Sequence, residues 1–393
     1  MEETNLNQTI RCIVKLGGAA ITCKNELEKI NEENLETVSS HLRQAMHLGS
    51  CSKQVMGMDW SKRDGVSDIS SSLCDFGDQC QFNVDFSRFV VVHGAGSFGH
   101  FQASKSGVHK GGLNQPLVKA GFVATRISVT TLNLEIVRAL AREGIPSIGM
   151  SPYSCGWSTS ERNVASADLL GVAKAIDSGF IPVLHGDAVL DDCLGCTILS
   201  GDVIIRHLAE HLRPEYVVFL VSFSRLVNSI DLLLHAPKIS LFTLHCTSLT
   251  LFHACFPINV IYKTDVSGVY DRPPTDPNAV LLREIAVDED GKWSVVKPTP
   301  QSMNKQVEIT VAAHDTTGGM VTKVSEAAMI AKLGIDVYIV KAATSHSLRA
   351  LRGELRHDIP DDWLGTVIRY KFQESDICVT MLASLRSRNF HNL

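Results

Sequence analysis

The chain lacks the features that mark nucleic-acid-binding, secreted and zinc-cluster proteins. Its 393 residues carry a net charge of −5 at pH 7, so there is no basic excess for nucleic acid. The N-terminus, MEETNLNQTI, is acidic and polar, without the apolar segment of a signal peptide. Eleven cysteines, an odd number, predict reduced thiols and a cytoplasmic location. Cys193 and Cys196 form a CxxC pair without a second pair, so no zinc site is expected.

Acidic residues are absent from one long internal segment. No Asp or Glu lies between Asp85 and Glu135, where lysine, arginine and histidine recur. The apolar run Phe89–Val92 predicts a buried strand. Three glycines follow it in the spacing GxGxxG: Gly94, Gly96 and Gly99. A dinucleotide loop needs an acid about 20 residues further on to bind the ribose, so the sequence argues against a nicotinamide or flavin cofactor. A compact phosphate fits better, and a purely structural glycine turn is the remaining alternative.

Strands alternate with helices along most of the chain, which predicts an α/β fold with a mainly parallel sheet covered on both faces. The expected order is a strand entering a Gly-Gly turn at 10–22, a helix at 30–49, a strand at 89–92, a helix at 117–142, a strand at 145–150, a helix at 166–179, a strand at 180–187, a helix and a strand within 199–220, and a Gly turn, a helix and a strand within 316–342. Residues 50–84 are rich in Ser, Asp and Gly and predict a flexible surface loop.

The helix at 117–142 has apolar residues at helical spacing, and they are expected to share one face. They are Leu117, Val118, Phe122, Val123, Ile127, Leu132, Ile136, Val137 and Leu140. This face either lines a pocket for an apolar ligand or belongs to the ordinary core.

Two further glycine turns lie beside lysines. Lys15 precedes Gly17-Gly18 at the end of the first strand, where α/β proteins bind ligands. Gly318-Gly319 leads into a helix whose unpaired N–H groups favour a phosphate, and Lys323 lies one turn into that helix. Asp202 lies at a helix start, where it is either an N-cap or an acid held between lysines.

Five motifs follow one another along the chain: KLGGAAIT followed by Lys24, HGAGSFGH, SGDV followed by the dipeptide LA, TDVSGVYD, and TGGM followed by Lys323. This order resembles the amino acid kinase superfamily. The GSFGH ending, closed by His100, resembles the isopentenyl phosphate kinase family, because superfamily members that act on carboxylates generally lack that histidine. The resemblance covers nearly the whole chain apart from 50–84, a segment at 221–263 and the tail after about 371.

The resemblance implies an open αβα sandwich spanning 10–371, with an acceptor-binding part at about 10–190 and a nucleotide-binding part at about 195–371. It implies that ATP and Mg²⁺ are used to phosphorylate isopentenyl phosphate to isopentenyl diphosphate in isoprenoid biosynthesis. The expected assembly is a cytoplasmic homodimer without nucleic-acid or membrane partners. The alternatives are another kinase of the superfamily, with a carboxylate, nucleotide or phosphonate acceptor, and an inactive isoform.

The resemblance also implies roles for individual residues. The implied catalytic residues are Lys15, Lys24, His100 and Asp202, with Asp202 orienting the lysines and His100 holding the acceptor phosphate. The implied substrate-binding residues are Gly96, Ser97, Gly99 and His100. The implied nucleotide-binding residues are Gly17, Gly18, Thr264, Asp265, Gly268, Gly318, Gly319 and Lys323. No protein ligand for the metal is implied, because phosphate-bound Mg²⁺ needs few carboxylates.

The segment 221–263 departs from the family's pattern. Without it, the strand YVVFL would run directly into the TDVSGVYD motif. A membrane span, a genuine insertion and a translated intron are the three interpretations. Histidines and Pro257 argue against a membrane span. We favour a retained, plant-like intron, because Val221 requires a codon that begins with GT, Lys263 is compatible with a terminal AG, and the segment is rich in residues with T-rich codons.

Overall fold

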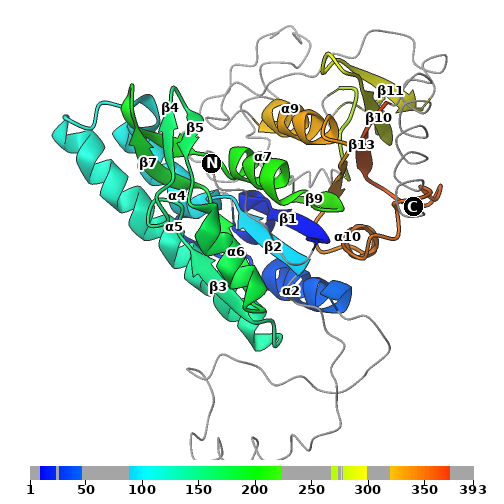
Figure 1. Cartoon of the computed structure of the whole chain (residues 1–393), viewed down its shortest axis with the longest axis horizontal. Helices are drawn as coiled ribbons and strands as arrows, with labels where there is room; N and C mark the ends of the chain where they lie inside the picture. Colours follow the sequence, from blue (N-terminus) through cyan, green and yellow to red (C-terminus); the bar gives the residue numbers. More distant parts are fainter. Residues whose placement is uncertain are drawn as a thin grey trace, which may run out of the picture.

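The computed structural model describes residues 9–23, 26–46, 88–222, 267–272, 276, 278–298 and 319–371, and the structural statements below concern these residues. They form a nine-stranded sheet in the order β11-β10-β13-β12-β9-β1-β2-β6-β3 and a four-stranded sheet in the order β5-β4-β7-β8 (Figure 1). The strands are β1 Cys12–Leu16, β2 Phe89–His93, β3 Ser147–Met150, β4 Ser158–Ser160, β5 Asn163–Ser166, β6 Ile181–His185, β7 Asp187–Asp191, β8 Gly195–Leu199, β9 Tyr216–Val221, β10 Glu284–Val287, β11 Trp293–Lys297, β12 Asp336–Lys341 and β13 Thr366–Tyr370. The helices are α1 Gly18–Ile21, α2 Glu32–Met46, α4 Gly96–Ser106, the 3₁₀ turn η4 Val108–Lys110, α5 Pro116–Arg142, α6 Leu169–Asp177, α7 Gly201–Leu212, α9 Gly319–Ala331 and α10 Ser345–Leu351.

The central strands are buried along their whole length because helices cover both faces of the sheet. Every residue of β1, β2, β6 and β9 is buried, the pattern typical of parallel strands. β1 pairs in parallel with β2 and with β9, so Leu16 lies opposite His93 on one side and Leu220 on the other. The carboxyl ends of these three strands therefore meet at one edge of the sheet.

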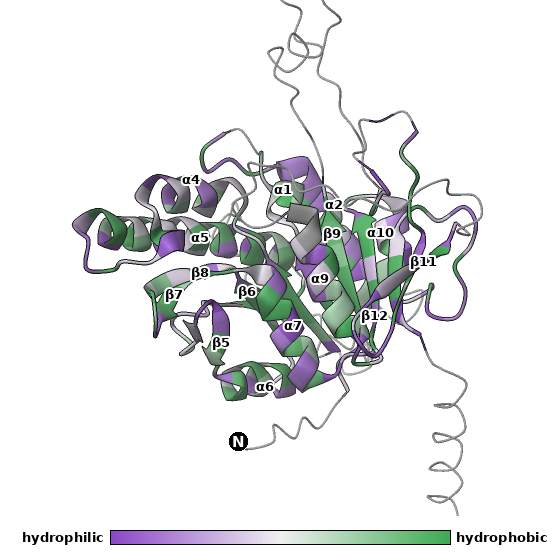
Figure 2. Ribbon diagram, turned by 90° about the horizontal axis from the view of Figure 1, so that it is seen from above, coloured by the Kyte–Doolittle hydropathy of each residue, from purple (hydrophilic) through white to green (hydrophobic). Residues whose placement is uncertain are grey.

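Successive residues of a strand face different helix layers, as the two-residue period of a strand requires. Ile13 and Val90 pack with apolar residues of α6, α7 and α9. Cys12 and Val14 pack on the other face with residues of α2, α5 and α10. In Figure 1, α7 and α9 lie above the strands while α2 lies below them, and Figure 2 shows hydrophobic residues gathered along β9 between the helices. The arrangement is a three-layer αβα sandwich, as the sequence predicts.

A smaller apolar cluster lies away from the large sheet. It joins α4 and α5 to the β7–β8 hairpin of the four-stranded sheet, and it contains Ala103, Val108, Val118, Phe122, Ala188 and Cys196. Gly121 allows the close approach of α5 to α4, because a Cβ there would lie 2.0 Å from the Cβ of Ser106. This side cluster forms a second core beneath the two helices.

The expectation of one shared apolar face on α5 is wrong. Leu132, Ile136 and Leu140 are buried against the sheet, but Val123 and Ile127 are 54% and 65% exposed on another side of the helix. Leu117 is also exposed. In a helix, residues spaced by four or seven share a face, and the nine apolar positions span two such sets. α5 therefore carries both a core-facing stripe and a solvent-facing apolar stripe.

Most expected elements are found with ends displaced by a few residues. The helices expected at 30–49 and 166–179 are α2 and α6, and the strand expected at 145–150 is β3. The expected loop at 50–84, the tail after 371 and the segment 221–263 beyond Ser222 lie outside the described residues. The five described cysteines are all free thiols. Among the described helices, none is long and apolar enough to cross a membrane.

Candidate active site

Two glycine turns meet at the carboxyl edge of the sheet. Gly17-Gly18 follows β1, and the turn from Gly94 to Gly96 follows β2. Gly94 N–H donates to the Leu16 carbonyl (2.9 Å), which joins the turns directly. A Cβ on Gly18 would lie 2.2 Å from the Gly96 nitrogen, so only glycine permits this approach.

The hydroxyl of Thr22 ties the two turns together. It donates to the Gly18 carbonyl (2.8 Å) and accepts a hydrogen bond from the Ser97 N–H (3.0 Å). Gly96 has a φ of +54°, a conformation that favours glycine at the start of α4. The N-terminus of α4 thus lies beside the β1 turn, and the positive end of its helix dipole favours an anion there.

A lysine–acid–lysine group lies at the same edge. Lys15 in β1 donates to Asp202 Oδ1 in the first turn of α7, and both side chains are 5% exposed. Lys323 of α9 lies 3.8 Å from the other carboxylate oxygen. Gly201 makes room for this contact, since a Cβ there would lie 3.3 Å from Lys15 Cε. Asp202 of α7 therefore connects the central strand β1 with α9 of the same helix layer.

Asp202 is not the N-cap of α7, so that alternative for it is wrong. The hydroxyl of Ser200 caps the helix by accepting from the N–H groups of Asp202 and Val203. The Asp202 carboxylate is left to bind the two lysines. Its position in the first turn also places a negative charge near the positive end of the helix dipole.

Burial controls the charges of this group. Desolvation lowers the pKa of Lys15 to about 8, although the neighbouring Asp202 carboxylate opposes the shift. Burial raises the pKa of Asp202, but the two lysines outweigh it and hold that pKa below its usual value. Two lysines and one acid give this group a formal net charge of +1 beside the glycine turns.

His100 and Gly99 lie on α4, beyond its first residues. His100 is half-buried in the second turn of the helix that begins at Gly96. Gly99 faces α5, where a Cβ would lie 2.6 Å from Val129 Cγ1, so its lack of a side chain lets the helices pack. The N–H of Ser97 is already bonded to Thr22. The substrate-binding roles of these residues remain predictions.

The other predicted site residues lie partly inside and partly outside the described part of the chain. Gly268 packs against β13, where a Cβ would lie 2.7 Å from Thr366 Oγ1. Gly319 begins α9, and Lys323 follows in the same helix. The remaining predicted residues lie outside the described part of the chain: Lys24, Thr264, Asp265 and Gly318. The structure thus brings together Lys15, Asp202 and Lys323.

A buried histidine pair beneath the glycine turn was not predicted from the sequence. His93 ends β2 and His185 ends β6, and their rings stack 5.4 Å apart. Desolvation lowers the pKa of His93 to about 3 and also lowers that of His185, so both rings are neutral. Asn133 of α5 donates to His93 Nε2 (3.1 Å). The signal available in the sequence is the His-Gly dipeptide that closes both strands.

A second ion pair lies just beyond that histidine pair. Asp187, with a fully buried side chain, lies 3.4 Å from Arg126 of α5. Ser151 links the two, because its hydroxyl donates to Asp187 (2.9 Å) and accepts from Arg126 (2.8 Å). These contacts fix the start of the β7–β8 hairpin against α5, and the sequence analysis did not identify them.

This combination of an αβα sandwich, paired glycine turns and a buried lysine–acid–lysine group is chemically suited to hold phosphate groups. The chain belongs to the amino acid kinase family, whose model matches residues 11–230 and 257–341. The gap in that match falls inside the segment 221–263 that departs from the pattern.

Its relatives are isopentenyl phosphate kinases. The chain is 66% identical to the isopentenyl phosphate kinase of Arabidopsis thaliana over 93% of this chain and 97% of that protein. It is 27% identical to that of Methanothermobacter thermautotrophicus, over 87% of this chain and 95% of that protein. A solved isopentenyl phosphate kinase has the same fold, with a TM-score of 0.56 at 24% identity over 87% of this chain and 96% of that one.

Proposed function

We propose that this chain phosphorylates isopentenyl phosphate with ATP, giving isopentenyl diphosphate for isoprenoid biosynthesis. The observation that carries the proposal is the 66% identity to the Arabidopsis enzyme along nearly its whole length. The buried lysine–acid–lysine group supports a transfer between two polyanions. The GSFGH ending, closed by His100, supports a phosphate acceptor rather than the carboxylates of other superfamily kinases.

The transfer needs positioning and charge neutralisation more than a general base. An oxygen of the acceptor phosphate is already anionic at neutral pH; it attacks the γ-phosphorus of ATP while the bond to the β-phosphate oxygen breaks and ADP leaves. Lys15 and Lys323 offset the repulsion between the two phosphate groups, and Asp202 holds both amines in place. We assign Lys24 to the same task.

For the donor, we propose Mg²⁺-bound ATP. The Asp202 carboxylate is occupied by two lysines, so phosphate oxygens rather than this acid would hold the ion, as Mg²⁺ prefers. When bound, Mg²⁺ neutralises charge on the β- and γ-phosphates. The proposed nucleotide contacts are Gly17, Gly18, Thr264, Asp265, Gly268, Gly318, Gly319 and Lys323, mostly in the part at about 195–371.

For the acceptor, we propose that the phosphate binds at the start of α4, with Gly96, Ser97, Gly99 and His100, in the part at about 10–190. An isoprenoid tail also needs an apolar surface, and we propose that α5, which packs beside α4, supplies it. The side cluster itself is closed, because its six residues are at most 8% exposed. Burial of a five-carbon tail on such a surface contributes about 0.8 kcal/mol per CH₂ group.

We further propose a cytoplasmic homodimer. The exposed stripe of α5 borders an open groove of about 820 Å³ whose apolar lining includes Val123, Ile127 and Leu134, with Tyr153 at its side. A self-complementary apolar helix face is suited to a two-fold interface. Ile127→Asp should convert the dimer to a monomer in light scattering, whereas a wild-type monomer would contradict this assembly.

The function is tested by coupled ADP release against a panel of alkyl monophosphates, carbamate, UMP and amino acids. Isopentenyl phosphate should give the highest kcat/KM. A higher value for a carboxylate or a nucleotide would replace the proposed acceptor. Calorimetry should show binding of Mg-ATP and none of NAD, and the opposite result would overturn the kinase assignment.

A further inference from the structure

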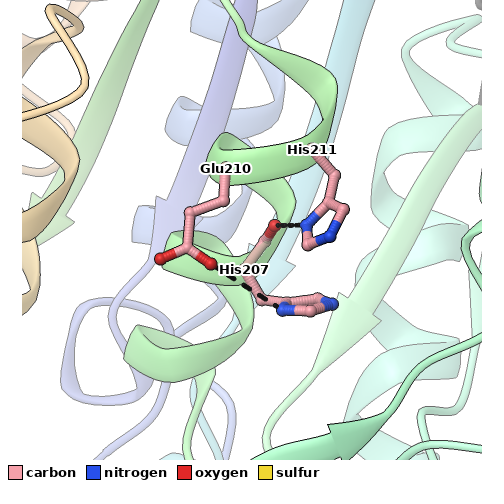
Figure 3. A group of neighbouring side chains, drawn as sticks. All are labelled: His207, Glu210 and His211. Atoms are coloured by element: carbon pink, nitrogen blue, oxygen red, sulfur yellow. Dashed lines mark hydrogen bonds and ion pairs between the residues drawn. The ribbon is translucent and has the colours of Figure 1, made fainter. Parts of the chain in front are cut away.

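A group of three metal-ligating side chains lies in the last turns of α7, away from the glycine turns. His207, Glu210 and His211 each offer one ligand atom, and these atoms lie within 4.8 Å of one another. The spacing i, i+3, i+4 brings the side chains onto one face of the helix. Figure 3 shows both imidazoles and the carboxylate projecting from this face of α7. We name these three residues the α7 triad.

We propose that the α7 triad binds one divalent transition-metal ion such as Zn²⁺ or Ni²⁺. Imidazole and carboxylate are suitable ligands for these ions, at distances of about 2.0–2.2 Å. Ligand atoms around a tetrahedral ion would lie about 3.3–3.5 Å apart at such distances. Side-chain rotations that move the ligand atoms by about an ångström would bring the triad to that geometry. The fourth coordination position would then be left for water.

The hydrogen bonding of His211 matches that of a metal ligand. Its Nδ1 lies 2.8 Å from the His207 carbonyl, to which it donates, so Nε2 keeps the lone pair that a metal binds. His207 is held from the other side by Trp157, whose ring meets it edge-on at 5.4 Å.

The surroundings of Glu210 allow its carboxylate to turn to a metal. One oxygen accepts from Arg206 (2.9 Å), while the other lies 3.9 Å from His207 Nδ1. Arg206 has a second acid, Glu326 of α9, at 2.7 Å. The arginine therefore stays paired when Glu210 binds the ion. The negative end of the helix dipole, at these last turns, adds to the attraction for a cation.

The test uses the full chain without an affinity tag and titrates it with NiCl₂ while Trp fluorescence is recorded. Ni²⁺ at the triad should quench Trp157, which contacts His207, with one ion bound per chain. Calorimetry with ZnCl₂ should give the same stoichiometry. Trp157→Phe should remove the quenching but leave the calorimetric binding in place.

Two variants of the triad and two controls decide whether the triad is the site. His211→Ala and His207→Ala should each weaken binding by about tenfold or more, because each removes a ligand. His357→Ala, at an exposed histidine elsewhere, and Cys193→Ser, at a thiol that could bind soft metals, should leave the affinity unchanged. His211 is exposed, so its loss is not expected to unfold the chain. Unchanged affinity in both histidine variants, or loss of binding with Cys193→Ser, would overturn the proposal.

Discussion

The two ends of α7 have opposite chemistry. The first turn carries Asp202, which is held by Lys15 and Lys323. Together the two lysines and the acid have a net positive charge, which suits a phosphate. The last turns carry His207, Glu210 and His211, which suit a cation. Along the helix, Asp202 is separated from His207 by about 7.5 Å and from His211 by about 13 Å, at 1.5 Å per residue. The helix dipole favours each arrangement at the end where it occurs.

The difference shows which kind of site depends on long-range contacts. The α7 triad lies within five consecutive residues, and the helical repeat alone places its side chains together. The lysine–acid–lysine group needs β1, α7 and α9 to converge, with Gly201 leaving space for Lys15. A change at the first end should therefore affect catalysis strongly, and a change at the second end should affect it little.

The largest effect is expected for Asp202→Asn. The change removes the charge that holds two lysines while it keeps the side-chain shape. Turnover should fall by about a thousandfold, and the free energy of unfolding should fall by about 3 kcal/mol because Lys15 is left buried without a counter-charge. Steady-state kinetics and urea unfolding give the two values.

Glu215→Gln is the matched control for that change. Glu215 also binds two cations, Arg88 and Arg356, but just before the amino end of β9. Because this end of the sheet lies opposite the glycine turns, Glu215→Gln should change turnover less than twofold. It should lower the free energy of unfolding by about 0–1 kcal/mol, the usual contribution of partly exposed ion pairs. Equal losses of turnover in the two variants would mean that the acid of α7 has only a structural role.

The next effect is expected at His100, which should hold the acceptor phosphate. His100→Ala should lower turnover by about a hundredfold or more, the cost of one preorganised donor. His100→Gln should be milder, because the amide keeps a donor. Wild-type turnover in the alanine variant would remove this histidine from the mechanism and weaken the choice of acceptor.

Local patterns were sufficient for much of the fold. Continuous apolar runs such as Phe89–Val92 and helical spacing in 30–49 correctly predicted the layers of the sandwich. The error concerned α5, where apolar periodicity was assigned to one face. Val123 and Ile127 are apolar yet exposed, and no pattern within a single chain distinguishes a core stripe from a stripe left on the surface.

For the site, the sequence identified residue types better than partners. Convergence of Lys15, Asp202 and Lys323 was expected from the family resemblance, because neither capping nor periodicity predicts contacts across the chain. The stacked pair of His93 and His185 was missed, since it requires β2 and β6 to be neighbours in the sheet. The α7 triad was missed although its spacing was readable.

A smaller effect is expected from titration of Lys15. Its pKa of about 8 lies below that of an ordinary lysine, so the amine loses its proton as the pH rises through 8. The kcat/KM should be constant below that pH and fall about tenfold per unit above it. Bound phosphates stabilise the protonated amine, so the kcat profile should fall at higher pH.

Lys15→Arg tests whether this lysine causes the loss. A guanidinium stays charged at these pH values, so the basic limb should disappear even though its different shape lowers turnover. The profile of His357→Ala should match that of the wild type. A limb near pH 8 that persists in the arginine variant would assign the titration to another group.

The last prediction concerns residues 221–263, next to the strand that supports the glycine turns. Leu220 accepts the N–H of Gly17 (2.8 Å), and the Val221 carbonyl accepts that of Ala342 (2.8 Å), so the end of β9 holds β1 and β12 together. Closing a loop of this length costs only about 3 kcal/mol in chain entropy. The apolar composition of the segment is the larger hazard for solubility.

Deleting 221–263 joins Leu220 to Thr264, whose β-branched side chain suits the buried position of Val221 in β9. We expect soluble yield and turnover on isopentenyl phosphate to rise together, by several-fold. A second deletion, of 222–264, keeps Val221 and is equally long. It should restore solubility equally, and any difference in ATP affinity would then report on the Thr264 hydroxyl. If the full chain is as soluble and active as both deletions, or if both deletions are inactive, the segment is a genuine part of the enzyme and the intron interpretation is wrong.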